Sequence, residues 1–307
     1  MKPFISICIP AYKNTAYLDV LLQSVKAQTF RNYEVIVSDD SPNDEVEDLC
    51  KIYATVFPLQ YHKNSPAKGS PANWNQGIAL AKGEWIKIMH DDDWFADEHS
   101  LEKFAKVAND HPGVGFIFSG YSNFENGILK KVSIPGSFVE SKLKRSALCL
   151  FAKNYIGAPS TTLIRNDRND WYDVQTKWVV DFEFYIRCLT DRPFYIIHES
   201  LINVGFNEEQ ITKVTFGNRD IEIPENIYIL NKMGTAILKN MAVYNHYWRL
   251  FRNLSVRSIG EVQQSCGNNS IPEAIKKMLQ MQFKVPLSIL RIGIFSRLLM
   301  IISFYTN

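Results

Sequence analysis

The chain has 307 residues and a formal net charge of +2, and 46% of its residues are hydrophobic. A chain of this size and composition can bury a substantial core, which argues against a disordered protein. Its cysteines include no C-x-x-C pair, so we expect reduced thiols of a cytoplasmic protein rather than a zinc site or a disulfide framework: Cys8, Cys50, Cys149, Cys188 and Cys266.

The first half of the sequence predicts alternating strands and helices. Residues 4–9 form an almost continuous apolar run, typical of a strand buried on both faces, and we expect no signal peptide before them. Helices are expected at 15–28, 44–56, 72–81 and 98–110, and further strands at 33–37, 59–62, 84–89 and 114–118. This alternation predicts βαβ units and an α/β fold with a mainly parallel, doubly wound sheet.

The alternation ends after Gly120. The remaining pattern predicts a hairpin or long loop at 121–140, helices at 141–153 and around 181–187, and strands at 160–165 and 194–198. Residues 226–252 are predicted to form one amphipathic helix, and residues 285–305 are apolar nearly all round.

Charge is distributed unevenly along the chain. Residues 226–307 contain ten basic residues and only two acidic ones, Glu261 and Glu273, so this tail carries +8 and residues 1–225 carry −6. A basic tail on an acidic body predicts an anionic partner, either a membrane or a nucleic acid.

Two groups of carboxylates follow two of the predicted strands. Asp39 and Asp40 come after the strand at 33–37, and Asp91, Asp92 and Asp93 follow the strand at 84–89. In a doubly wound sheet such positions line one crevice, where carboxylates can hold Mg²⁺ or Mn²⁺ together with substrate phosphates. The alternative is that these carboxylates only cap turns and helices.

The turn after the first strand contains Tyr12, whose ring can stack on a nucleotide base or simply join the core. Residues 10–15 contain no glycine, and no Walker loop is present. We therefore expect phosphates to be bound through a metal ion and side chains rather than by a glycine-rich loop.

Five stretches together resemble glycosyltransferase family 2, which has the GT-A nucleotide-sugar transferase fold. They are I-C-I-P-A-Y-K-N at 7–14, V-I-V-S-D-D-S-P-N-D at 35–44, G-S-P-A-N-W-N-Q-G at 69–77, A-K-G-E-W-I-K-I-M-H-D-D-D-W at 81–94 and V-D-F-E-F-Y-I-R at 180–187. The resemblance covers about residues 3–215. It implies a catalytic domain at 1–225, with a nucleotide-sugar-binding half at 1–120 and an acceptor half at 121–225, followed by a basic helical extension at 226–307.

The resemblance also implies roles for individual residues. Asp92 and Asp93 would hold Mn²⁺ or Mg²⁺, while His90, where the family more often has aspartate, is predicted to have no ligand role. Asp181 would be the general base; because Val180 replaces the family's usual glutamate before it, Glu183 is the alternative base. Arg187 is predicted to be a structural ion-pair partner. The donor nucleotide would be bound by Pro10, Tyr12, Asp39, Asp40, Lys68, Asn75 and Asp91.

The activity implied is inverting, metal-dependent transfer of a sugar from a nucleotide-diphosphate donor, a UDP-sugar in preference, to a hydroxyl of a saccharide acceptor. The acceptor is expected to be polyprenyl-linked, as in bacterial O-antigen or capsule assembly. A catalytically silent nucleotide-sugar-binding protein of the same fold and a nucleotidyltransferase are the alternatives. Nucleic-acid binding would explain the basic tail but not the acidic crevice.

Residues 285–305 are long enough for a membrane span of roughly 20 residues. However, Arg291 and Arg297 lie within the segment, and each costs about 2.5–3.5 kcal/mol near a bilayer centre. We therefore predict that the segment lies in the interface of an anionic membrane, and that the protein is peripheral on the inner face of the cell membrane. Packing against the catalytic domain or in an oligomer contact is the alternative.

Overall fold

The computed structural model describes residues 2–167, 169–206, 215–267 and 269–307. Contacts divide the chain into two compact units. The first unit comprises Met1–Arg145, Tyr155–Val174 and Phe184–Glu208, and the second comprises Ser146–Asn154, Gln175–Glu183 and Glu209–Asn307.

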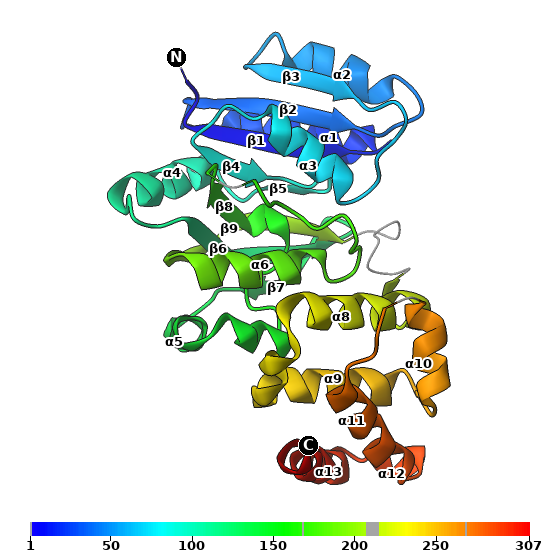
Figure 1. Ribbon diagram of the computed structural model, residues 1–307. Coiled ribbons are helices and arrows are strands. Elements are labelled where there is room, and N and C mark those ends of the chain that lie inside the picture. The colour runs from blue at the N-terminus through cyan, green and yellow to red at the C-terminus, as the bar shows by residue number, and fades with distance from the viewer. Residues whose placement is uncertain (1, 168, 207–214, 268) are drawn as a thin grey trace. The chain divides into compact units, whose positions relative to one another are not determined.

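The first half of the first unit alternates strands and helices as the sequence predicts. In chain order the elements are β1 (Ile5–Ala11), α1 (Thr15–Ala27), β2 (Tyr33–Asp39), α2 (Glu45–Tyr53), β3 (Leu59–Lys63), α3 (Ala72–Leu80) and β4 (Trp85–Ile88). β1 pairs in parallel with both β2 and β4, and β2 pairs in parallel with β3. Figure 1 shows α1, α2 and α3 beside these strands.

The second half of the sheet is mixed. Its elements are β5 (Asp93–Phe95), α4 (Ser100–Asp110), β6 (Phe116–Glu125), β7 (Ile128–Ser133), α5 (Ser137–Arg145), η2 (Pro159–Thr161), β8 (Thr162–Arg165) and β9 (Phe194–Phe206). β6 is parallel to β9, whereas β8 runs antiparallel to β4 and β6, and β5 runs antiparallel to β9. The strand order is β3-β2-β1-β4-β8-β6-β9-β5, and β7 forms the predicted hairpin with β6.

Burial explains why the first strands and helix form. Ile5, Ile7 and Ile9 of β1 are fully buried, because the strand has neighbours on both edges and apolar cover on both faces. α1 begins where the Asn14 side chain accepts a hydrogen bond from the Tyr17 amide at 3.1 Å. It buries an apolar stripe at helical spacing, made of Leu18, Leu21, Leu22 and Val25.

The second unit is mainly helical. It contains η1 (Ala147–Phe151), the first residues of α6 (Val180–Asp191), α8 (Arg219–Met233), η3 (Thr235–Lys239), α9 (Met241–Asn253), α10 (Ile259–Cys266), α11 (Glu273–Phe283), α12 (Leu287–Leu290) and α13 (Gly293–Thr306). α8 and α9 lie side by side (Figure 1), and the Tyr247 hydroxyl donates to the Asn226 carbonyl at 2.8 Å.

Three predicted segments are corrected by the structure. The helix expected at 226–252 is two helices, because Gly234 at φ +83° ends α8 and a 3₁₀ turn precedes α9. The helix expected at 141–153 begins earlier, at Ser137, and is followed by the short helix η1. Residues 285–305 form α12 and α13 rather than one continuous segment, because Ile292 between them is extended.

The predicted domain boundary at residue 225 falls inside α8. The functional division into donor and acceptor halves remains a prediction. Among the described residues, no helix combines the length and apolar character that a membrane crossing requires.

Candidate active site

The carboxyl ends of β1, β2 and β4 bring several predicted residues to one edge of the sheet. Ala11 at the end of β1 lies opposite Asp39 at the end of β2, and the Asp40 amide donates to the Ala11 carbonyl at 3.0 Å. The Tyr12 amide donates to Asp91 Oδ2 at 3.2 Å, which joins the turn after β1 to the acidic segment after β4. Tyr12 is 54% exposed, and Lys13 Nζ lies 4.7 Å from the centre of its ring, so a base would stack on the ring face that Lys13 leaves uncovered.

Asp39 is fully buried, and both of its carboxylate oxygens have partners within the protein. Oδ1 accepts from the Ser41 amide at 2.8 Å, and Oδ2 accepts from the Tyr61 hydroxyl at 2.8 Å and lies 3.6 Å from Lys63 Nζ. Asp39 therefore fixes the end of β2 and supports its neighbour Asp40. Pro10, another predicted donor-site residue, lies one residue before Ala11 in β1, opposite Ser38.

Asp40 organises the loop that carries Lys68. Its Oδ1 accepts from Asn64 Nδ2 at 2.9 Å and from the Lys68 amide at 3.0 Å, and its Oδ2 accepts from the Gly69 amide at 2.7 Å. Gly69 has φ +73°, a conformation that glycine adopts without strain. The exposed side chain of Lys68 is thus held on an ordered loop beside the end of β2.

The side-chain amide of Asn75 is bonded to the backbone of Tyr172. Its Nδ2 donates to the Tyr172 carbonyl at 2.7 Å, and its Oδ1 accepts from the Tyr172 amide at 3.1 Å. Trp74 on the same helix lies edge-on to Tyr172 at 5.0 Å and stacks obliquely on His90 at 4.7 Å, measured between ring centroids. Asn75 therefore places α3 against the segment around Tyr172.

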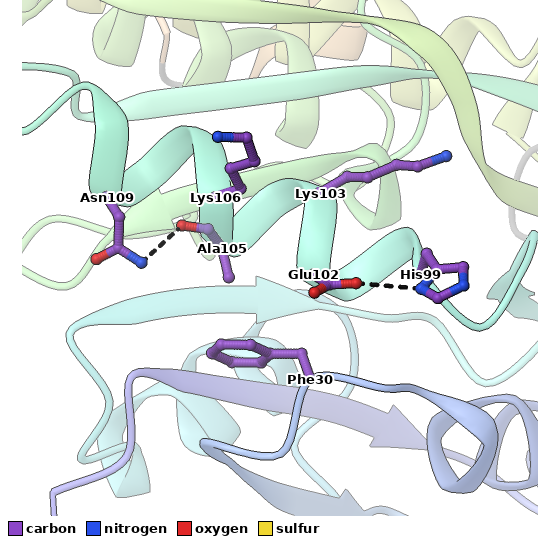
Figure 2. A pocket seen from close by; sticks show the side chains of 7 residues that line it. All are labelled: Phe30, His99, Glu102, Lys103, Ala105, Lys106 and Asn109. Carbon is purple, nitrogen blue, oxygen red and sulfur yellow. Dashed lines mark hydrogen bonds and ion pairs between the residues drawn. The ribbon is translucent and has the colours of Figure 1, made fainter.

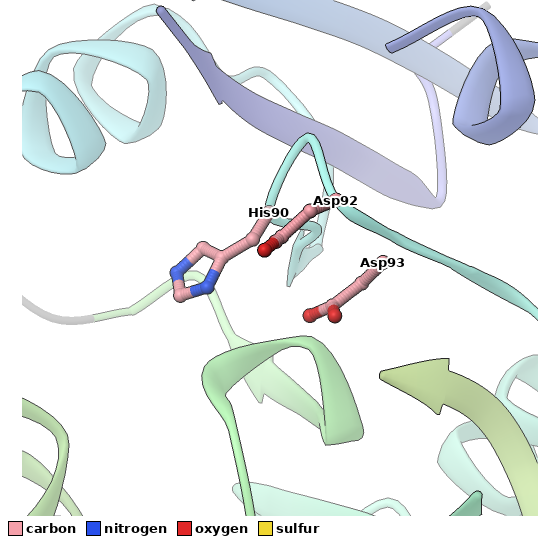
Figure 3. A group of neighbouring side chains, drawn as sticks. All are labelled: His90, Asp92 and Asp93. Atoms are coloured by element: carbon pink, nitrogen blue, oxygen red, sulfur yellow. The ribbon is translucent and has the colours of Figure 1, made fainter. Parts of the chain in front are cut away.

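His90, Asp92 and Asp93 form a cluster of potential metal ligands. One ligand atom from each lies within 4.8 Å of the other two. Figure 3 shows the three side chains as neighbours. In the part of the chain that the structure describes, His90 Nε2 and Asp93 Oδ2 are buried and have no hydrogen-bond partner. The His90 amide donates to Ser160 Oγ at 3.0 Å, and Asp93 Oδ1 accepts from the Gly205 amide at 3.1 Å, so the protein fixes both residues. The two carboxylates are suitable ligands for Mn²⁺ or Mg²⁺. The imidazole nitrogen suits softer divalent ions and therefore favours Mn²⁺ over Mg²⁺.

Electrostatics at the cluster favour a cation. Burial and the neighbouring charge of Asp92 raise the pKa of Asp93 well above its ordinary value, and the same two causes raise the pKa of Asp91 to about 7. Burial lowers the pKa of His90, which keeps its imidazole neutral and able to bind a metal. A divalent cation supplies the counter-charge that keeps crowded carboxylates ionised.

Lys87 lies behind this cluster and has no counterpart among the residues predicted from sequence. It is fully buried in β4, where burial lowers its pKa well below the ordinary value. Its Nζ donates to the carbonyls of Ser160 and Thr162, and it lies 4.5 Å from the centroid of the Phe104 ring. In the sequence, the only sign of this role is that Lys87 lies within a run of apolar residues predicted to form a strand. Its contacts indicate that it fixes the η2 segment, which includes the Ser160 that binds the His90 amide.

The predicted bases lie in the first turn of α6, within the second unit. Asp181 is half-buried, and burial raises its pKa to about 6; Asn154 Nδ2 donates to its Oδ2 at 3.4 Å. Glu183 is fully buried and lies 3.0 Å from Lys232 Nζ. Asp181 is the better candidate base, because its carboxylate is only half-buried and its pKa is raised to about 6, whereas the Glu183 carboxylate is fully buried and bonded to Lys232.

Glu225 is a further residue that the sequence does not reveal. Its carboxylate accepts hydrogen bonds from the amides of Lys177 and Trp178, each at 2.8 Å, and from the Val179 amide at 3.2 Å. It thereby fixes the residues just before α6. Arg187 forms the predicted structural ion pair, with Asp170 at 2.8 Å.

A surface hollow of about 560 Å³ beside α4 is a poor alternative site. Figure 2 shows His99 bonded to Glu102 there. His99 Nδ1 lies 3.1 Å from Glu102 Oε2. Lys103 pairs with Glu199 at 2.7 Å, and Lys106 pairs with Asp110 at 2.7 Å. The charged groups of this hollow are thus already engaged with groups of the protein.

Comparison with known proteins identifies the fold and the family. Residues 6–170 match Glycosyl transferase family 2. The chain belongs to this family. An uncharacterized glycosyltransferase of Haemophilus influenzae is 33% identical over 212 residues, which are 67% of this chain and 69% of that protein.

A second relative has a defined name. A GalNAc(5)-diNAcBac-PP-undecaprenol beta-1,3-glucosyltransferase of Campylobacter jejuni is 23% identical over 218 residues, 68% of this chain and 67% of that protein. The crystal structure of S. aureus TarS in complex with UDP-GlcNAc matches with a TM-score of 0.64 and 16% identity, covering 100% of this chain and 90% of that one. This match confirms the predicted GT-A fold. As a member of the family, the chain is a glycosyltransferase.

Proposed function

We propose that this glycosyltransferase is an inverting, metal-dependent enzyme that transfers a sugar from a UDP-sugar to a hydroxyl of a saccharide acceptor. The cluster of His90, Asp92 and Asp93 carries the proposal, because two of its buried ligand atoms have no hydrogen-bond partner within the described residues. The geometry supports a ligand role for His90, which the sequence had not led us to expect. Mn²⁺ or Mg²⁺ bound there would stabilise the negative charge of the departing diphosphate.

The other proposed roles follow from the contacts of each side chain. The exposed ring of Tyr12 would stack on the uracil base, while Asp40 holds the loop of Lys68 beside the donor. Asp91, whose position is fixed by the Tyr12 amide, would accept from a ribose hydroxyl. TarS, which shares the fold, has been crystallised with UDP-GlcNAc, and this favours UDP as the donor nucleotide.

We assign the proton transfer to Asp181. Its carboxylate would accept the proton of the acceptor hydroxyl as that oxygen attacks the anomeric carbon from the face opposite the diphosphate. The new carbon–oxygen bond forms while the bond to the nucleotide diphosphate breaks, through an oxocarbenium-like state. One displacement of this kind inverts the anomeric centre and requires no covalent intermediate.

The donor proposal can be tested by thermal unfolding of the full chain with UDP-, GDP- and dTDP-sugars in the presence of Mn²⁺. A ligand that binds the folded state raises the unfolding temperature by mass action, so the UDP-sugars should stabilise most. Stabilisation by GDP- or dTDP-sugars alone would contradict uridine diphosphate as the donor nucleotide. Binding without slow donor hydrolysis or transfer would instead favour a catalytically silent nucleotide-sugar-binding protein.

We also propose that the acceptor saccharide is lipid-linked and that the protein works at the inner face of the cell membrane. The name of the Campylobacter jejuni relative, which includes an undecaprenol-linked saccharide, supports this, as does the +8 charge of residues 226–307. Labelled sugar should pass from the donor into butanol-extractable lipid when membranes are supplied. Label found only in water-soluble saccharide would contradict the proposed acceptor.

A further inference from the structure

Helix α13 exposes its apolar face. Its buried residues are Ser296, Met300 and Ser303, and the two serines bind α9: Trp248 Nε1 donates to Ser296 Oγ at 3.0 Å, and Tyr244 Oη lies 2.7 Å from Ser303 Oγ. The opposite face is 51–76% exposed and consists of Ile294, Phe295, Leu298, Ile302 and Tyr305. A surface helix normally has the reverse arrangement, so this face is suited to an apolar environment.

A pocket of about 570 Å³ lies between α9 and α13. Arg249, Arg252 and Arg297 are among its lining residues, and no carboxylate is. Arg252 is held in place, because Nη1 donates to Ser296 Oγ at 3.0 Å and Nη2 donates to Asn253 Oδ1 at 2.8 Å. Gly293, the first residue of α13, also lines the pocket.

The three arginine charges in this pocket have no acidic residue among the lining residues to balance them. Burial and the neighbouring Arg249 lower the pKa of Arg252, as expected where guanidinium groups lie together. The start of α13 has no side-chain cap, so the positive end of its dipole adds to the same field. Arginine is the residue best suited to bind phosphate oxygens in a bidentate manner.

We propose that the pocket between α9 and α13 binds the phosphate of an anionic membrane lipid while the exposed face of α13 enters the bilayer interface. The two features adjoin in sequence, since Ser296 and Arg297 of the pocket lie between Phe295 and Leu298 of the apolar face. A free phosphate would leave this apolar face in water. A second copy would bring a like-charged surface against this one, at a cost in repulsion.

This site deepens the proposed membrane role of the enzyme and rests on it, but not on the donor or the chemistry. The side chains involved lie wholly in the second unit, so donor binding can be measured separately as a control. Loss of UDP-sugar stabilisation would count against the proposed donor, and not against the lipid site. Loss of vesicle binding would count against the membrane role and the lipid site, and not against the donor or the chemistry.

The decisive experiment is co-sedimentation of the full chain with vesicles of phosphatidylcholine containing phosphatidylglycerol. We compare the wild type with the double variant Arg249→Gln/Arg297→Gln and with a control of equal charge, Lys277→Gln/Lys284→Gln, whose lysines are exposed and outside the pocket. A basic residue near an anionic surface is worth about a factor of five, so charge alone predicts equal losses for the two variants. A phosphate site predicts that the arginine variant loses about tenfold more affinity than the control.

Two outcomes would overturn the proposal. One is equal loss in the two variants, which would show only general attraction to the surface; the other is failure of the wild type to sediment with anionic vesicles. The variant Phe295→Ser/Leu298→Ser should also lose vesicle binding. If it instead only dissociates an oligomer, detected by light scattering, the apolar face is an interface between copies.

A final comparison separates a lipid from a soluble phosphate. Dihexanoyl-phosphatidylglycerol should raise the unfolding temperature of the full chain at concentrations where glycerol phosphate does not, because its acyl chains add apolar contact. The arginine variant should lose this effect. Equal stabilisation by glycerol phosphate would assign the pocket to a soluble phosphate and overturn the lipid proposal.

Discussion

At the scale of single residues, the candidate site is defined by which oxygen and nitrogen atoms already have partners. Asp39 and Asn75 use their polar atoms to fix the backbone of the protein. His90 and Asp93 each keep a buried atom without a hydrogen-bond partner in the part of the chain that is described. Such atoms are costly unless a ligand or ion satisfies them, so substitutions in this cluster should change metal binding.

Replacing Asp92 by alanine should abolish transfer and greatly weaken nucleotide binding, because the diphosphate loses its metal counter-charge. His90→Ala should weaken Mn²⁺ binding as well. Both variants should fold, and the matched control Asp110→Ala, at an exposed position of α4, should behave like the wild type. Mn²⁺ affinity and transfer rate are the measurements. Full wild-type activity in excess EDTA would disprove metal dependence.

Replacing Asp181 by asparagine should lower kcat by roughly 10²–10⁴ while donor binding stays near that of the wild type. The comparison is Glu183→Gln. If that variant loses most of its kcat while Asp181→Asn is only mildly affected, Glu183 is the general base. Because the base must be ionised and the pKa of Asp181 is raised to about 6, kcat should fall as the pH drops through about 6.

The same shift predicts an effect on stability. The pKa of Asp181 is raised to about 6 in the folded chain, against about 3.9 in an unfolded one, so the folded state binds the proton more tightly. The charged carboxylate therefore costs stability above pH 6, and this cost fades as the pH falls through that value. Asp181→Asn should raise the unfolding temperature at pH 8 more than at pH 5. A variant less stable at pH 8 would contradict this assignment.

Tyr12→Ala should weaken donor binding by about 1–3 kcal/mol, the usual free energy of stacking between a base and an aromatic ring. Tyr12→Phe keeps the ring and should cost much less. The measurement is calorimetric titration with the donor nucleotide and Mn²⁺. Equal losses in both variants would mean that the hydroxyl, and not the ring, makes the contact.

At the scale of elements, distant side chains fix where helices begin. The residues before α6 have amides that bond to Glu225 of α8. Glu225→Ala would leave these amides unpaired and should lower the free energy of unfolding by about 1–3 kcal/mol. Glu273→Ala, at an exposed position of α11, is the control and should change it little. Urea unfolding measures both, and equal effects would contradict an anchoring role for Glu225.

At the scale of the whole molecule, the C-terminal helices are part of the second unit rather than a detachable tail. Gln282 of α11 donates to the Trp248 carbonyl at 2.9 Å, and Ser296 and Ser303 of α13 bond to Trp248 and Tyr244. A chain ending at Gly267 would expose these buried groups of α9. It should therefore be less stable and aggregate, as thermal unfolding and light scattering would show. A soluble truncated chain with an unchanged unfolding temperature would disprove this coupling.

The sequence by itself determined the alternating strands and helices of the first half, the GT-A fold and the family. The alternation follows from local patterns: apolar runs of strand length and helical stripes such as that of α1. The GT-A fold and the family follow instead from the resemblance of five sequence stretches, among them the acidic run directly after β4, to glycosyltransferase family 2. Local periodicity is enough because it reports which face of each element is buried. The acidic run likewise marks the edge of the sheet where the candidate site forms.

The tertiary structure alone decided which polar atoms are engaged, and with which partners. Tyr61 and Asp39 are 22 residues apart, and Asn75 and Tyr172 are 97 apart, so no spacing rule joins them. For the same reason, only the structure places His90 in the ligand cluster. It also decides which face of α13 is buried: Ser296 and Ser303 bind α9, and the apolar face is left exposed. Periodicity shows that a helix has two faces, but the neighbour it meets decides which of them is buried.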